Sequence, residues 1–125
     1  MSLGKVLIVD DEAEVRRLLQ EFLSLRGYDV VLAGSGMEAL EAVEGQKPDL
    51  VLLDVAMPEM DGVETLGRIV ALEPALPVIM VTANTDISVT SKLLAMGAVD
   101  YIPKPFDLEY LDQAVSIQLA AGEDR

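Results

Sequence analysis

Short apolar runs alternate along the chain with longer segments in which apolar residues recur every three or four positions. The runs are rich in valine, leucine and isoleucine and predict five strands, at residues 5–9, 29–33, 50–53, 77–81 and 99–102. The longer segments predict five helices, at residues 14–26, 35–44, 63–72 and 87–96 and from Asp107 onward. Ser35 and Asp107 are typical N-terminal caps, and Gly27 and Gly97 are typical helix stops. This order predicts an α/β fold, a parallel sheet with helices on both faces.

The predicted strands are almost continuously apolar, which is typical of strands buried on both faces. Pro103 follows the fifth strand and has no N–H to donate, so that strand is predicted at an edge of the sheet. We find no linker or low-complexity segment, and the pattern predicts one domain over residues 4–121. Residues 1–3 are expected to be an expression remnant or a disordered start. Residues 122–125 are expected to be a frayed end or the beginning of a linker to another domain.

Polar residues stand where the predicted strands end. They are Asp10, Asp11 and Glu12 after the first strand, Asp54 after the third, Thr82 after the fourth and Lys104 after the fifth. In an open α/β sheet, ligands bind beyond the carboxyl ends of the strands. We therefore expect these carboxylates, the hydroxyl and the ammonium to converge on one rim.

Carboxylates gathered in this way repel one another, at a cost of roughly 4 kcal/mol for two charges about 4 Å apart at an effective dielectric near 20. Lys104 offsets only part of that repulsion. A divalent cation that prefers oxygen ligands would offset the rest, and Mg²⁺ needs only one or two carboxylates, a carbonyl and waters. The alternative for any single aspartate is helix capping, and Asp11 is a candidate cap of the first helix.

Composition narrows the chemistry further. The 125 residues include no cysteine and no histidine, so disulfides, thiolate metal sites and a histidine base are excluded. The net charge of −13 disfavours direct binding of nucleic acid by this domain. No apolar run approaches the roughly 20 residues of a membrane helix, and no signal peptide is seen. We expect a cytoplasmic protein that does not enter the membrane.

Four motifs in fixed order resemble the response-regulator receiver domains of two-component signalling. They are VDDE at 9–12, LLDVAMPEMDG at 52–62, VTA at 81–83 and YIPKPF at 101–106. The likeness covers essentially the whole chain. It implies a flavodoxin-like, doubly wound sheet of five parallel strands in the order 2-1-3-4-5 with five helices.

The resemblance also implies a role for each matching residue. The implied roles are Asp54 as phospho-acceptor; Asp11, Asp10, Asp54 and the Ala56 carbonyl as ligands of Mg²⁺; Thr82, Lys104 and Tyr101 as phosphoryl-binding and switch residues; Pro105 in a cis peptide bond with Lys104; and Ala56 and Asn84 as residues that tune hydrolysis of the phosphoryl group. For Tyr101 the alternative is an ordinary edge-strand tyrosine.

The partner implied by the resemblance is a sensor histidine kinase or a histidine phosphotransfer protein. Phosphorylation would change the surface of the fourth helix, fifth strand and last helix. That surface would act on an output domain in cis, on a target in trans, or by forming a homodimer. The domain would catalyse only its own phosphorylation and dephosphorylation. The sequence leaves the cognate kinase, the output and the phosphate lifetime open.

Two other interpretations compete. Gly34-Ser35-Gly36 follows a strand and opens a helix, and Asp54 lies about 20 residues on, as in dinucleotide-binding proteins. The chain is too short after Asp54 for the second half of such a fold. A haloacid-dehalogenase-like phosphatase also uses an aspartate nucleophile, but needs a second acid where Ala56 stands.

Pro103 is a departure from the usual receiver pattern, and its effect on the switch is open.

Overall fold

The computed structural model describes residues 2–57, 59–83 and 87–123. Within them, strands and helices alternate strictly. The elements are β1 Lys5–Val9, α1 Ala13–Leu25, β2 Asp29–Ala33, α2 Gly36–Gln46, β3 Leu50–Asp54, α3 Gly62–Leu72, β4 Val78–Thr82, α4 Ile87–Ala95, β5 Asp100–Pro103 and α5 Leu108–Glu123. No helix in these three ranges is both long and apolar enough to cross a bilayer.

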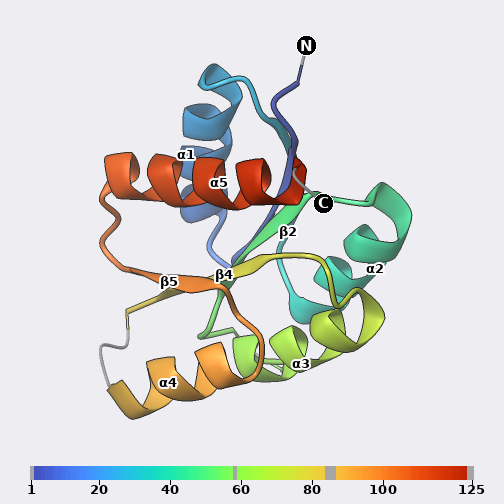
Figure 1. The fold of residues 1–125 in the computed structure, drawn as a ribbon. Coiled ribbons are helices and arrows are strands. Elements are labelled where there is room, and N and C mark those ends of the chain that lie inside the picture. Colours follow the sequence, from blue (N-terminus) through green and yellow to red (C-terminus); the bar gives the residue numbers. More distant parts are fainter. Residues whose placement is uncertain (1, 58, 84–86, 124–125) are drawn as a thin grey trace.

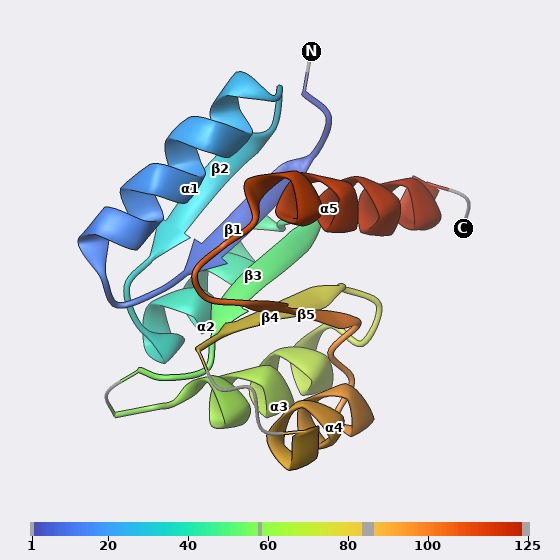
Figure 2. The same ribbon diagram turned by 90° about the vertical axis from the view of Figure 1, so that its left-hand side faces the viewer.

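The strands form one parallel sheet in the order β2-β1-β3-β4-β5, as the resemblance to receiver domains implies. β5 is an edge strand, and Pro103, which lacks an N–H, is its last residue. Helices α1 and α5 cover one face, and α2, α3 and α4 cover the other (Figures 1 and 2). The α/β architecture predicted from the alternating pattern is confirmed.

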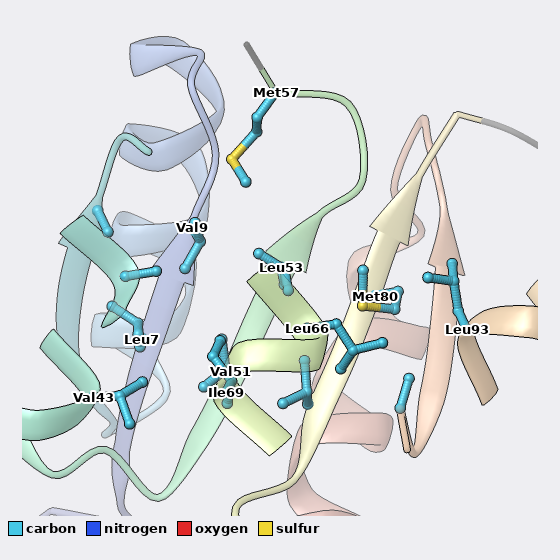
Figure 3. Close-up of a cluster of buried hydrophobic side chains, with 14 residues drawn as sticks. Leu7, Val9, Val43, Val51, Leu53, Met57, Leu66, Ile69, Met80 and Leu93 are labelled. Carbon is cyan, nitrogen blue, oxygen red and sulfur yellow. The ribbon is translucent and has the colours of Figure 1, made fainter. Parts of the chain in front are cut away.

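Each face of the sheet has its own apolar core. Side chains that alternate along each central strand point to opposite faces, so one strand supplies both cores. The core under α1 and α5 contains Val6, Ile8, Leu19, Leu23, Leu50, Leu52, Ile79, Leu111 and Val115. The core under α2, α3 and α4 contains Leu7, Val9, Val43, Val51, Leu53, Leu66, Ile69, Met80 and Leu93 (Figure 3). Burial of both faces explains why these strands read as unbroken apolar runs.

Most predicted boundaries lie within one residue of those observed, and the second helix ends two residues later than predicted, at Gln46. Several of the differences fall at the carboxyl end of the sheet. β3 extends to Asp54 and β4 to Thr82, so both polar residues belong to strands and are buried. Ser35 caps α2 as predicted, because its hydroxyl accepts a hydrogen bond from the Glu38 amide at 3.2 Å. The Glu38 carboxylate accepts a bond from the Gly34 amide at 2.8 Å, one residue before the cap.

Candidate functional site

Parallel strands place their carboxyl ends at one edge of the sheet, and the side chains of Asp10, Asp54 and Lys104 meet there. The ammonium nitrogen Nζ of Lys104 lies 3.0 Å from Oδ2 of Asp10 and 3.5 Å from Oδ2 of Asp54. Both aspartates are buried, with exposed fractions of 2% and 3%. Two buried carboxylates therefore share one partly buried ammonium.

Asp10 is bonded through all of its polar groups. Its amide donates to the carbonyl of Ala33 at 3.1 Å, and its carbonyl accepts from Nη1 of Arg16 at 2.6 Å. Oδ1 accepts from the Glu12 amide at 2.9 Å, and Oδ2 accepts from Lys104 at 3.0 Å. These bonds hold Asp10 in place and connect it to β2, to α1 and to Lys104.

Asp54 is the last residue of β3, a strand that is buried along its whole length. Its Oδ1 accepts a hydrogen bond from the Ala56 amide at 3.3 Å. The backbone at Asp54 is also approached closely by Gly62, the first residue of α3. A side chain on Gly62 would overlap the Asp54 carbonyl oxygen, and the Gly62 amide donates to the Val55 carbonyl at 2.8 Å. The start of α3 is thus packed directly against the strand end that carries the aspartate.

The loop after β3 is anchored on the apolar side as well. Met57 is 8% exposed and points from this loop toward the end of β1 near Val9 (Figure 3). Asp61 caps α3, accepting a hydrogen bond from the Glu64 amide at 2.9 Å. Both ends of the loop are therefore held, one by the core and one by a helix cap.

The electrostatics of the pocket appear in two pKa shifts. Burial, followed by the negative charge of Asp10, raises the pKa of Asp54, and Lys104 and the Ala56 amide offset part of this rise. Burial by itself would lower the pKa of Lys104. The hydrogen bond and charge of Asp10, with smaller contributions from Asp54, outweigh burial and raise that pKa. The lysine stays protonated, and an additional positive charge would favour ionised Asp54.

A group of acidic side chains lies at the outer edge of the pocket. Carboxylate oxygens of Asp10, Asp11 and Glu12 all lie within 4.8 Å of one another, and the last two residues are exposed. The predicted alternative that Asp11 caps α1 is not what is found: the N-cap is Glu12, and no side chain hydrogen bond caps the helix. These oxygen donors have the chemistry that Mg²⁺ prefers.

The other predicted residues surround this centre at different depths. Thr82 ends β4, is 2% exposed, and its carbonyl accepts from the Lys104 amide at 2.8 Å. The Lys104–Pro105 peptide bond is cis. Tyr101 lies on the edge strand β5 and is 38% exposed. Ala56 is exposed beside Asp54. Asn84 lies outside the described residues.

Comparison with known proteins decides the family. The family model for the response regulator receiver domain matches residues 6–116. The chain belongs to this family. A solved receiver domain from Methanospirillum hungatei JF-1, described as CheY-like, superposes with a TM-score of 0.93 at 32% identity and covers 98% of each chain. The predicted family and its flavodoxin-like fold are thus confirmed, and the dinucleotide and phosphatase interpretations are set aside.

Curated relatives of this receiver domain are longer proteins. The transcriptional regulatory protein ZraR of Escherichia coli K12 is 45% identical over 92% of this chain, which spans 26% of ZraR. Protein-glutamate methylesterase/protein-glutamine glutaminase 3 of Rhodospirillum rubrum is 50% identical over 81% of this chain, which spans 28% of that relative. The same receiver module is therefore found in relatives whose names describe different outputs.

Three features of the receiver site escaped the sequence patterns. Glu12 was noted at the strand end but given no role, although its amide binds Asp10 and its carboxylate joins the acidic group. Arg16 was counted as an ordinary helix residue. Gly62 is the last residue of the motif at 52–62 and received no role, so its close approach to Asp54 was not predicted. The available signal was the glycine itself, because a residue without a side chain is the usual choice where another segment must approach the backbone closely.

Proposed function

We propose that this receiver domain accepts a phosphoryl group on Asp54 from a phosphohistidine of a sensor histidine kinase or a histidine phosphotransfer protein. The observation that carries the proposal is the buried Asp54 at the end of a rigid strand, with Lys104 at 3.5 Å. A carboxylate held on a strand can be kept in line with an incoming phosphorus atom, which is what phosphoryl transfer chiefly requires.

The residues at the rim fit a resident Mg²⁺ ion. Two buried carboxylates have one ammonium between them. Burial, followed by the charge of Asp10, raises the pKa of Asp54, and a further positive charge nearby would favour its ionised form. Asp11 offers an exposed carboxylate beside that of Asp10. We assign Asp11, Asp10, Asp54 and the Ala56 carbonyl as the residues that would hold the ion. When bound, Mg²⁺ would neutralise negative charge on the phosphoryl oxygens.

Within this assignment Asp10 and Asp11 have different tasks. Both oxygens of Asp10 already accept hydrogen bonds, from the Glu12 amide and from Lys104. Asp11 is exposed and is the better direct ligand, with Asp10 in support. We base this division on charge and exposure, because Lys104 already pairs with Asp10 at 3.0 Å, whereas Asp11 is exposed to the solvent from which a hydrated Mg²⁺ ion arrives.

The transfer step uses the chain's own groups in a defined way. An oxygen of ionised Asp54 forms a bond to phosphorus as the phosphorus–nitrogen bond of the donor histidine breaks, and the bonding electrons return to the imidazole nitrogen. The Ala56 amide orients the carboxylate through Oδ1. Lys104 pairs with the transferred phosphoryl oxygens, and Thr82 contributes its hydroxyl. No proton has to be removed from Asp54, because its nucleophilic form is the carboxylate.

Loss of the phosphoryl group would proceed at the same site, by attack of water on phosphorus. Ala56 is small and exposed next to Asp54, which leaves room for that water. Asn84 is assigned to the same tuning role from the sequence. The domain would thus catalyse its own phosphorylation and dephosphorylation and act on no separate substrate.

The signal would leave through α4, β5 and α5. Lys104 follows β5 directly, and its backbone is bonded to Thr82 at the end of β4, so a phosphoryl group at the site adjoins both strands. We propose that Thr82 moves toward the phosphoryl group and the exposed Tyr101 moves inward. A local charge would then shift a pre-existing equilibrium between two surfaces.

The changed surface would act on an output domain in cis, as the greater lengths of the relatives favour, or on a target in trans. A phosphorylation-dependent homodimer through the same surface is a further outcome. The net charge of −13 favours leaving any nucleic-acid contact to another domain. The cytoplasmic location expected from the sequence stays a prediction.

Acetyl phosphate with Mg²⁺, followed by intact mass measurement, tests the acceptor. We expect an adduct of one phosphoryl group that is stable in acid and lost in alkali. It should be absent in Asp54→Ala and when EDTA replaces Mg²⁺. Asp29→Ala removes an exposed aspartate at the far end of β2 and should keep the adduct. An adduct that persists in Asp54→Ala would place the acceptor elsewhere.

A further inference from the structure

The turn Gly34–Gly36 between β2 and α2 has no part in the phosphoryl chemistry, yet both of its glycines adjoin segments of the site. A Cβ atom on Gly34 would lie 3.1 Å from Nη1 of Arg16. One on Gly36 would lie 2.5 Å from Oγ1 of Thr65 and 2.9 Å from Sδ of Met60. The loops that follow β1 and β2 leave the same end of the sheet (Figure 2). Because glycine has no side chain, both positions leave space for these neighbouring side chains.

Arg16 is the more informative of these neighbours. The residue is half-buried, and its Nη1 donates to the carbonyl of Asp10 at 2.6 Å. That carbonyl belongs to the peptide unit between Asp10 and Asp11. Because a peptide unit is planar, a short charge-assisted bond to its oxygen fixes the plane and with it the direction in which Asp11 continues.

We propose that Arg16, seated on Gly34, is a positioning residue that orients the Asp10–Asp11 peptide for metal binding. This inference rests on the proposed Mg²⁺ site. A guanidinium near a divalent cation repels it, so the charge of Arg16 by itself weakens binding. Positioning acts in the opposite direction, since ligands that are already oriented lose less freedom when the ion binds. The two roles therefore predict opposite signs for the effect of removing Arg16.

Calorimetric titration of Mg²⁺ into the whole chain measures that sign. Arg16→Gln should lower the affinity about tenfold, the usual scale for residues that orient metal ligands. Arg17→Gln removes the same charge from the neighbouring, exposed position of α1 and should leave the affinity unchanged or slightly higher. Arg16→Lys keeps the charge but lacks the planar fork of donors, so it should bind Mg²⁺ no better than Arg16→Gln.

Gly34→Ala provides a second, independent variant. The backbone of Gly34 is outside the left-handed region, so alanine is tolerated there, and the added Cβ would press on Nη1 of Arg16. We expect weaker Mg²⁺ binding in the wild-type background and no further loss when Arg16→Gln is already present. Gly45→Ala is the matched control, because a Cβ at Gly45 would meet no atom within 4 Å. Gly34→Ala also allows the proposal to be tested if Arg16→Gln fails to fold.

The outcomes separate this inference from the proposed function. Absence of Mg²⁺ binding in the wild-type chain would overturn the metal site itself. Wild-type binding with equal or tighter binding by Arg16→Gln would overturn only the positioning role of Arg16. Additive losses in the double variant Gly34→Ala with Arg16→Gln would also overturn it, because Gly34 would then act by another path. Melting temperatures in EDTA confirm that each variant is folded during the titration.

Discussion

At the carboxyl end of the sheet two buried carboxylates share one partly buried ammonium, whereas at the amino end the charged groups are exposed and bind backbone groups. There the amide of Lys5 donates to Oδ2 of Asp49 at 2.8 Å, and Nζ of Lys5 donates to the Gln46 carbonyl at 2.8 Å. Both ends use aspartate and lysine. At the amino end these side chains and the Lys5 amide form hydrogen bonds that involve backbone groups. At the carboxyl end the aspartate and lysine side chains form ion pairs with one another.

A hollow of about 550 Å³ lies at the amino end, lined by residues that include Leu3, Pro48, Pro77 and Leu119. The hollow thus lies at the amino end of the sheet, whereas the buried charged residues Asp10 and Asp54 lie at the carboxyl end. We place the chemistry at the carboxyl end, because ionised groups are buried only where pairing or function compensates for lost hydration. Substitutions of the same kind at the two ends should accordingly have different consequences.

The largest contrast is expected between two glycines. Gly62→Ala would push a side chain into the Asp54 carbonyl and should lower the free energy of unfolding by about 3 kcal/mol, since neither backbone can yield freely. Gly45→Ala, near the end of α2, meets no atom within 4 Å and should raise it by about 0.5 kcal/mol through better helix propensity. Urea denaturation measures both. Equal effects would show that the start of α3 is not pressed against Asp54.

The next contrast is between two lysines. Lys104→Met leaves Asp10 and Asp54 facing each other without the ammonium, and should cost about 2 kcal/mol in Mg²⁺-free buffer. Lys5→Met removes one exposed hydrogen bond and should cost about 0.5 kcal/mol. The double variant Lys104→Met with Asp54→Asn should recover part of the larger loss. If it recovers none, repulsion between the carboxylates is not the cause.

A change of pH should reveal the strain on Asp54. Its pKa is raised in the folded state above the usual 3.8, so folding favours the neutral carboxyl. The folded state then binds more protons than the unfolded state between these two pKa values, and stability falls as pH rises through that window. Asp54→Asn has no carboxyl group at this position, so it should not show this loss of stability with rising pH.

The melting temperature of Asp54→Asn in EDTA should therefore exceed that of the wild type by several degrees at neutral pH. The difference should shrink as pH falls toward 3.8. Mg²⁺ should narrow the gap at neutral pH by stabilising only the wild type appreciably. A variant less stable than the wild type at neutral pH would mean that Asp54 is held mainly by its attraction to Lys104.

The gathering of Asp10, Asp54 and Lys104 could be predicted because it depends on topology. Each residue stands at or just after the end of a parallel strand, and apolar runs locate those ends well. The bond from Arg16 to the Asp10 carbonyl could not be predicted, because it depends on how a loop turns its peptide unit. The contact of Gly62 with Asp54 depends likewise on the path of the loop between β3 and α3.

Local sequence rules also did not predict the conformation at two positions of α2 where contacts with other elements determine it. Lys47 ends α2 in a left-handed conformation, with φ at 51°, where a glycine would have been the usual signal. Glu38 has the spacing of a capping box, yet its carboxylate binds the Gly34 amide. In both cases the residue type was compatible with several conformations, and the neighbouring elements selected one.

The smallest expected effect isolates the amino end. Asp49→Ala removes the acceptor of the Lys5 amide and should cost less than about 1 kcal/mol, because water can replace the carboxylate at this exposed position. The cost should be the same with and without Mg²⁺, since the residue lies at the opposite end of the sheet from the acidic pocket. Denaturant titrations in EDTA and in excess Mg²⁺ measure the difference. A loss that depended on Mg²⁺ would mean that the two ends are energetically coupled through β1 and β3, and that charge at the amino end contributes to the site.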